Sequence, residues 1–157
     1  MADAKQTIGA RAGRELKDGQ IINLGIGLPT LIANFVPEGV DVVIQTENVA
    51  NWIVPGKMLA GMGGAMDLMT GAKTVYIVSD HCSKDGASKL MKQCTFPLTG
   101  AEEADVIITE RALFRRYPDK GFVLEEVAVG YTLDDIAGCT DMAYTVADDV
   151  ALDAFGE

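Results

Sequence analysis

The sequence predicts an α/β domain with a mostly parallel sheet and helices on both faces. Short apolar runs typical of buried strands recur along the chain, at residues 21–25, 42–45, 74–78 and 104–110. Segments with helical periodicity or helix-start signals lie between and beside them. Gly is frequent, with 17 residues among 157, as expected where many turns join short elements. Short buried strands that alternate with helices are typical of α/β domains.

The composition is that of one globular domain, which we assign to residues 1–157. Apolar residues make up 48% and charged residues 23% of the chain, as in a protein with a real core. The net charge of −10 argues against a nucleic-acid partner, because neutralising phosphates requires clustered Lys and Arg. No apolar run is long enough to span a bilayer. Since the polar N-terminal segment also lacks the apolar core of a signal peptide, we expect a cytoplasmic protein.

The first helix is expected at residues 3–17. Apolar residues recur there at a spacing of four and give one apolar stripe, formed by Ala4, Ile8, Ala12 and Leu16. The sequence KDGQ then turns the chain, and IINLG at residues 21–25 is typical of a short buried strand. A second helix is expected through about Phe35, because Pro29 suits the first turn of a helix.

The middle of the chain continues this alternation. A turn at residues 37–41 precedes the second strand, VVIQ. The glycine run GMGG then leads into a short helix at residues 65–69. The third strand follows at residues 74–78, a helix is expected at residues 85–94, and the fourth strand is expected at residues 104–110.

A hairpin and a capped helix are expected near the C-terminus. The runs at residues 112–117 and 121–127 flank a Pro-Asp-Lys-Gly turn and are typical of a β-hairpin. Thr132 is a typical N-cap and is followed by acids, so a short helix is expected at residues 132–136. The acidic tail from Asp141 is weakly patterned.

Polar and glycine residues follow three of the expected strands. They are Gly25-Ile26-Gly27, Glu47-Asn48 and Ser79-Asp80-His81. Because ligands of parallel sheets bind at the carboxyl ends of the strands, we expect these residues to meet at one crevice.

The residues at these strand ends allow several chemistries. Glu47 follows the second strand, where a carboxylate serves as a base, a metal ligand or a nucleophile; a loop entry of no chemical role is the alternative. The GIG motif at residues 25–27 lacks the third glycine of a dinucleotide-binding loop, so a tight turn is a more common interpretation than a phosphate site. In GMGGAMD, glycines lead into a helix start, where exposed backbone N–H groups could bind an anion or stabilise an oxyanion. The alternative interpretation is a turn packed under the helix. No cluster of metal-ligand residues stands out in the sequence, so we assign no metal site.

Cysteine and histidine residues give no strong signal for nucleophilic catalysis. Cys82, Cys94 and Cys139 are far apart in the sequence and form no CxxC motif, so reduced, partly buried thiols are expected. His81 is the one histidine. Its neighbour Cys82 would point to the opposite face of an extended segment, which argues against a Cys–His pair.

The sequence resembles the β subunit of the family I CoA-transferases, a group that includes the acetoacetate, butyrate, acetate and succinyl-CoA:3-oxoacid CoA-transferases. The resemblance extends to about residue 137. It rests on LKDGQIINLGIGLPTLIANFVPEGV, QTEN, ANWIVPGKMLAGMGGAMDLMTGAK, HCSKDGASKLMKQCTFPLTG, ADVIITE and GFVLEEVAVGYTLDDI. The catalytic signature of the family is Ser-Glu-Asn-Gly, and here it reads Thr46-Glu47-Asn48-Val49.

The resemblance implies that Glu47 is the catalytic glutamate. Its carboxylate would attack an acyl-CoA thioester, and the CoA thiolate would return to form a glutamyl-CoA thioester. A short-chain (3-oxo) carboxylic acid would then accept the CoA. A glutamate of ordinary pKa is ionised at neutral pH and needs no activating base.

The resemblance also implies the surroundings of that glutamate. We expect Asn48, Gly63 and Gly64 to bind the substrate or the developing oxyanion. Gly25, Gly27 and Lys57 are the residues expected to bind CoA. Coenzyme A would be a substrate and no cofactor would be permanently bound. The partner would be a CoA-transferase α-type subunit in a hetero-oligomer, with no nucleic acid or membrane involved.

The sequence departs from the family after Asn48. In the family a further block of sheet and helix separates the signature from the stretch ANW-VPGK, whereas here Asn48 joins VANWIVPGK almost directly. The missing block is on the order of sixty residues, a large part of a domain of usual size. The sequence therefore predicts an internally shortened CoA-transferase β-like domain.

Two alternatives to an active CoA-transferase subunit follow. One is a catalytically inactive, shortened relative that retains the interaction between subunits, as the Thr-Glu-Asn-Val junction suggests. The other is an α/β protein that uses its glycine loops to bind a sugar phosphate.

Overall fold

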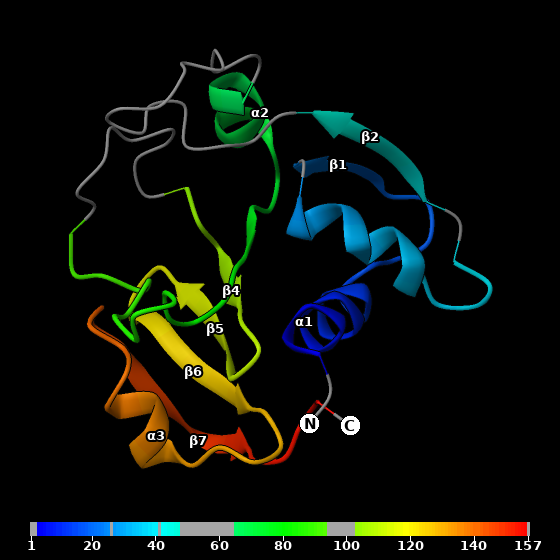
Figure 1. Cartoon of the computed structure of the whole chain (residues 1–157). Coiled ribbons are helices and arrows are strands. Elements are labelled where there is room, and N and C mark those ends of the chain that lie inside the picture. The colour runs from blue at the N-terminus through cyan, green and yellow to red at the C-terminus, as the bar shows by residue number, and fades with distance from the viewer. Residues whose placement is uncertain (1–2, 26, 41, 48–64, 94–102, 157) are drawn as a thin grey trace.

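Two β-sheets and four helical segments make up the described part of the chain (Figure 1). The computed structural model describes residues 3–25, 27–40, 42–47, 65–93 and 103–156. Among these residues, no helix is long and apolar enough to cross a membrane.

The N-terminal part contains a helix, a two-stranded parallel sheet and a 3₁₀-helix. Its elements are α1 (Ala4–Gly13), β1 (Ile21–Gly25), η1 (Leu28–Phe35) and β2 (Val43–Glu47). Helix α1 begins where the Asp3 carboxylate accepts a hydrogen bond from the backbone N–H of Lys5 at 3.2 Å, which satisfies a free donor of the first turn. The helix expected at residues 3–17 is therefore confirmed, but it ends earlier, at Gly13.

The second sheet has five strands in the order β3-β4-β5-β6-β7. Their bounds are β3 (Tyr76–Val78), β4 (Val106–Ile108), β5 (Ala112–Tyr117), β6 (Gly121–Val127) and β7 (Thr145–Ala151). The outer pairs β3–β4 and β6–β7 are parallel, whereas β4–β5 and β5–β6 are antiparallel. The expected hairpin is β5–β6.

Two short α-helices complete the described elements. Helix α2 spans Ala65–Gly71 and helix α3 spans Leu133–Ala137. The N-cap predicted for α3 is confirmed, because the Thr132 hydroxyl accepts from the Asp135 N–H and the Asp135 carboxylate accepts from the Thr132 N–H. This reciprocal capping box satisfies two donors at the start of the helix.

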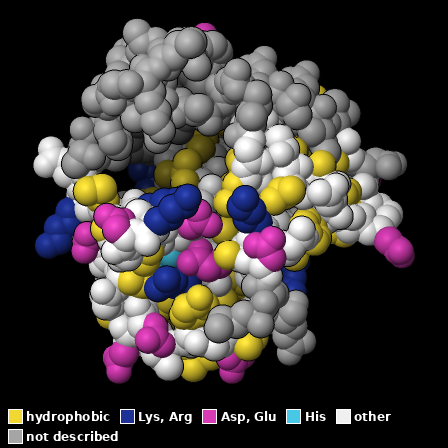
Figure 2. All heavy atoms as spheres, viewed as in Figure 1, with side chains coloured by type: hydrophobic (Ala, Val, Ile, Leu, Met, Phe, Trp, Pro, Cys, Tyr) yellow, Lys and Arg dark blue, Asp and Glu magenta, His cyan; other side chains and the backbone are white. Residues whose placement is uncertain are grey.

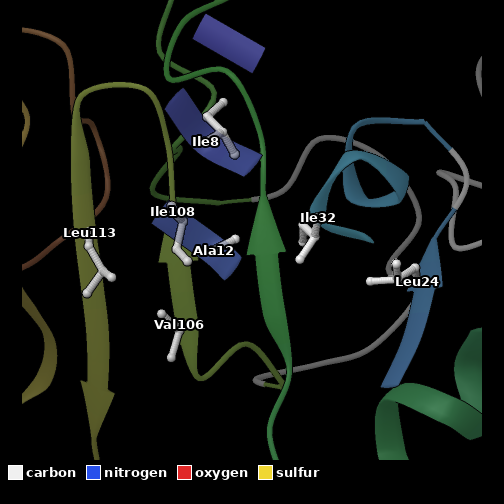
Figure 3. Close-up of a cluster of buried hydrophobic side chains, with 7 residues drawn as sticks. All are labelled: Ile8, Ala12, Leu24, Ile32, Val106, Ile108 and Leu113. Atoms are coloured by element: carbon white, nitrogen blue, oxygen red, sulfur yellow. The ribbon is translucent and has the colours of Figure 1, made fainter. Parts of the chain in front are cut away.

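The five-stranded sheet carries one hydrophobic cluster on each face. Val106 and Ile108 of β4 pack with α1, η1 and β1, whereas Ile107 between them packs on the other side with α3. This follows from the alternation of side chains along a strand. Figure 3 shows the first cluster, formed by Ile8, Ala12, Leu24, Ile32, Val106, Ile108 and Leu113.

The α/β fold class is confirmed, with α1 over one face of the five-stranded sheet and α3 over the other. Three of the five described strand pairs are parallel.

The helix predicted at residues 85–94 is wrong over its described part, residues 85–93. The chain forms a tight turn there instead. The Ser83 N–H and hydroxyl both donate to the carbonyl of Ala87, at 2.8 and 3.0 Å. Gly86 adopts a φ of 86°, and Cys82 then pairs with Ser88 in an antiparallel bridge. Ser and Asp side chains that bond to nearby backbone compete with helix formation.

The acidic tail contains a strand that the sequence pattern did not predict. Residues of β7 pair in parallel with β6, from Val123 opposite Thr145 to Glu126 opposite Ala151. The strand is largely exposed, so it lacks the apolar alternation that identifies a half-buried strand.

Candidate functional site

Gly25 and Glu47 lie side by side at the carboxyl ends of β1 and β2. The two strands are parallel and in register from Ile21 opposite Val43 to Gly25 opposite Glu47. Glu47 is the last residue of β2 and does not lie in the loop after it. The expectation that the first two strand ends meet is therefore confirmed. Gly25, which has no side chain, lies next to the candidate glutamate.

Gly27 directs the chain from β1 into η1. Its φ of 107° and ψ of −126° belong to a region that residues with a β-carbon rarely adopt. The Gly27 carbonyl accepts from the Thr30 hydroxyl at 2.6 Å and from the Thr30 N–H at 3.2 Å. Pro29 occupies the first turn of η1, as predicted. The turn is thus fixed by a glycine conformation and by local hydrogen bonds.

The other predicted site residues lie outside the part of the chain that the structure describes. They are Asn48, Lys57, Gly63 and Gly64. Helix α2 begins at Ala65, directly after the two glycines, as the sequence predicted.

The third strand is not paired with the first two. β3 belongs to the five-stranded sheet, whereas β1 and β2 form a sheet of their own. The backbone N–H of His81 donates to Glu110 at 2.8 Å, which directs this loop toward the end of β4. Among the described strands no pairing connects β3 with β1 or β2, so strand pairing brings together only the first two strand ends, and the convergence of Ser79-Asp80-His81 on the same crevice stays a prediction.

His81 is a fully buried residue whose ring joins two segments. Its Nδ1 lies 2.9 Å from the Thr109 hydroxyl and its Nε2 lies 2.9 Å from the Thr140 hydroxyl. Burial lowers the pKa of His81 to about 4, although the charge of Glu110 opposes this effect. Because burial disfavours the charged ring and both ring nitrogens have hydroxyl partners, His81 is a neutral structural residue.

A buried charge network ties α1 to the five-stranded sheet. Arg11 is 5% exposed and donates to both oxygens of Glu126, at 2.6 and 2.7 Å. It also donates to Glu15 at 2.9 Å, and Glu15 lies 3.3 Å from Arg115. Burial alone would lower the pKa of Arg11, but the hydrogen bonds and charges of the two glutamates raise it.

This network could not be found from the sequence. The spacing of Arg11 and Glu15 by four residues on a helix is visible. Glu126 lies far along the chain, and no pattern in one sequence relates it to Arg11.

The surface charges on the described face are of both signs. Figure 2 shows Lys and Arg side chains beside Asp and Glu side chains across its middle. A hollow of about 420 Å³ at the surface of β6 and β7 is lined by four acids, Glu125, Glu126, Asp148 and Asp149, together with Lys120. An acidic lining disfavours a polyanionic ligand, so this hollow is not a site for phosphates.

The family model for coenzyme A transferases matches the chain in two segments. They are residues 5–52 and residues 45–138, which overlap at residues 45–52. Together they cover most of the chain.

Individual proteins give the same relationship. The chain is 35% identical to the acetate CoA-transferase subunit beta of Escherichia coli, over 94% of this chain and 96% of that protein. That alignment extends over 209 residues, whereas 94% of 157 residues is about 148, so about 60 aligned positions have no residue in this chain.

Two longer proteins are similar as well. The chain is 32% identical to human mitochondrial succinyl-CoA:3-ketoacid coenzyme A transferase 2, over 92% of this chain but 41% of that protein. The structure of an acyl-CoA transferase of E. coli O157:H7 (YdiF), a thioester complex with CoA, superposes with a TM-score of 0.75. It shares 18% identity over 97% of this chain and 43% of that one, a likeness of fold.

Proposed function

The chain belongs to the coenzyme A transferase family, and from this premise we propose that it acts as a β-type subunit through Glu47. The reaction would move CoA from an acyl-CoA to a short-chain (3-oxo) carboxylic acid. The observation that carries the proposal is the position of Glu47, at the carboxyl end of β2 and in register with Gly25. Ligands of parallel sheets bind at this edge.

A carboxylate at this position can carry the whole exchange. A Glu47 oxygen attacks the acyl carbon, the C–S bond breaks, and CoA leaves as a thiolate with the electron pair, which yields an anhydride. The thiolate then attacks the glutamyl carbonyl and expels the donor carboxylate, leaving glutamyl-CoA. The acceptor carboxylate reverses both steps. No external base is required, because glutamate is ionised at neutral pH.

The remaining site residues are proposed from the resemblance and from their place in the chain. Each acyl transfer passes through a tetrahedral oxyanion, for which Asn48 and the amides of Gly63 and Gly64 are the proposed donors. Gly25 and Gly27 would let CoA approach the backbone closely, and Lys57 would meet a CoA phosphate. CoA enters this scheme as a substrate, without a permanently bound cofactor.

We propose an α-type subunit as the partner. The bacterial relative is named a beta subunit and is matched over nearly its full length, whereas the human relative extends well beyond the matched region. The acidic composition of this chain, with a net charge of −10, suits CoA phosphates poorly. Basic groups of the partner would supply the missing charge.

The second candidate function is a shortened relative that binds its partner without turnover. It is supported by the two overlapping family matches and by the 60 or so unmatched positions of the bacterial relative. Val49 stands where the family signature has glycine, and a β-carbon there would hinder a positive φ or a close approach.

A transfer assay separates the two functions. The chain is mixed with an α-type CoA-transferase subunit, acetoacetyl-CoA or succinyl-CoA, and acetate, and formation of acetyl-CoA is followed. We expect Glu47→Gln to lower turnover by roughly 10³-fold or more without loss of the complex. Glu38→Gln is the matched control, because Glu38 is exposed in the turn before β2. A stable complex without turnover in the unaltered chain would favour the inactive relative.

A further inference from the structure

Two segments that are distant in the sequence are held together beside the end of α3. They are residues 81–90, which follow β3, and residues 139–142. The N–H groups of Asp141 and Met142 both donate to the carbonyl of Leu90, at 3.0 and 2.8 Å. The His81 ring bonds to the Thr140 hydroxyl at 2.9 Å. These contacts fix the segments at both ends.

This arrangement brings two thiols together. Cys82 follows His81 and Cys139 precedes Thr140, and both cysteines are free and half-buried. Burial raises the pKa of the Cys139 thiol, the charge of Arg111 opposes this rise, and Cys82 adds to it by its charge and a side-chain hydrogen bond. The two sulfur atoms are therefore neighbours in the folded chain.

A fixed guanidinium group lies beside the thiols. Arg111 Nη1 donates to the Cys139 sulfur at 3.5 Å. Its Nε donates to Glu110 at 3.0 Å, and its guanidinium carbon lies 5.2 Å from the centre of the Tyr131 ring. The guanidinium favours the thiolate, which is the reactive form of cysteine, and so counteracts part of the burial that raises the pKa of Cys139.

We propose that Cys82 and Cys139 are a modification site, at which a peroxide converts the two thiols into a reversible disulfide. The Cys139 thiolate attacks one oxygen of hydrogen peroxide and forms a sulfenic acid, with hydroxide as the leaving group. The Cys82 thiol then attacks that sulfur and releases water, so two thiols and one peroxide give one disulfide and two waters. A later thiol reductant restores both cysteines.

The structural effect would be a covalent link between the loop after β3 and the end of α3. Neither cysteine is among the residues proposed for CoA transfer, and Glu47 and Gly25 belong to the other sheet.

Disulfide mapping of the full chain tests the proposal. The folded protein is treated with hydrogen peroxide, the remaining thiols are alkylated, and the peptides of a non-reducing digest are identified by mass. We expect a Cys82–Cys139 link that dithiothreitol reverses, with Cys94 alkylated. In urea we expect mainly the Cys82–Cys94 link, because closing the shorter loop costs less entropy. A Cys82–Cys94 link in the folded chain, or separate sulfinic acids without a cross-link, would overturn the proposal.

Variants of Arg111 test the role of the guanidinium. Arg111→Met should slow disulfide formation several-fold, because the positive charge that favours the Cys139 thiolate is lost, whereas Arg111→Lys retains the charge and most of the rate. The rates are compared after urea unfolding has shown that both variants fold with the same midpoint as the unaltered chain. Equal rates for Arg111→Met and the unaltered chain would contradict this role.

Discussion

His81 illustrates how one buried polar residue is accommodated. Its ring nitrogens are bonded to Thr109 and Thr140, and its backbone N–H is bonded to Glu110. The imidazole is accommodated in its neutral form, because burial penalises the charged form more than the charge of Glu110 favours it. The only histidine of the chain therefore stabilises the packing between the loop after β3, the end of β4 and the end of α3.

Protonation of His81 should make stability depend on pH. The pKa is about 4 in the folded chain and about 6.5 in an unfolded one, so the unfolded state binds the proton more readily. The stabilisation is complete above pH 6.5 and is lost as the pH falls toward 4, by roughly 3 kcal/mol in all. Urea unfolding at pH 7, 6 and 5 measures the change.

A variant isolates this effect from other titrations. His81→Gln keeps a donor and an acceptor but does not titrate, so its stability should be flat between pH 7 and pH 5. The lowered pKa of Glu15, which results from its bonds to Arg11 against the opposing effect of burial, affects stability only at lower pH. An equal pH dependence in His81→Gln and the unaltered chain would show that another group titrates.

At the level of elements, local signals predicted most of the fold. The Thr132 cap, Pro29 in the first turn of η1, and the β5–β6 hairpin all depend on residues close together in the sequence. Dependence on local signals also explains why the helix predicted at residues 85–94 is wrong. Residues 85–93 have a helical composition, but their turn is fixed by hydrogen bonds of Ser83 and by pairing with Cys82.

Helix α1 packs on η1 through glycines, which gives a prediction at this scale. A β-carbon on Gly13 would lie 2.4 Å from the carbonyl oxygen of Phe35, a backbone atom that cannot move aside cheaply. Gly13→Ala should therefore destabilise the chain by about 1 to 3 kcal/mol. Gly71→Ala is the control, because no atom lies within 4 Å of its β-carbon position, and its stability should be unchanged or slightly higher. Urea unfolding compares them, and equal stability of both variants would refute this packing.

Across the whole molecule, the N-terminal unit is joined to the five-stranded sheet by apolar packing and by charge. The cluster in Figure 3 joins α1, η1 and β1 to β4 and β5, and Arg11 reaches Glu126 of β6. Removing one partner from a buried ion pair leaves the other without compensation. The network therefore helps to hold α1, against which η1 and β1 pack, on the five-stranded sheet.

Substitution of Arg11 tests this connection. Arg11→Met should cost about 2 to 4 kcal/mol of unfolding free energy, somewhat below the value for a fully buried pair, because Glu126 is partly exposed. Lys89→Met is the matched control, because Lys89 and Asp80 form an exposed pair at 3.3 Å and such pairs contribute at most about 1 kcal/mol. Similar losses in the two variants would contradict the role of Arg11.

Long-range relations mark the limit of prediction from the sequence. The meeting of Gly25 and Glu47 followed from the rule for parallel strands, and the structure has them in register. The separation of β3 into another sheet and the pairing of Arg11 with Glu126 depend on which elements become neighbours in space. Neither is encoded in a local pattern.

The central claim is that Glu47 forms the covalent intermediate, and intact mass tests it most directly. The chain is mixed with an α-type subunit and acetoacetyl-CoA or succinyl-CoA, without an acceptor, and its mass is measured. We expect an adduct of the mass of CoA on the unaltered chain and on Glu38→Gln, lost on treatment with hydroxylamine, and absent from Glu47→Ala. A folded, partner-bound chain without the adduct, or an adduct that persists in Glu47→Ala, would contradict the proposed mechanism.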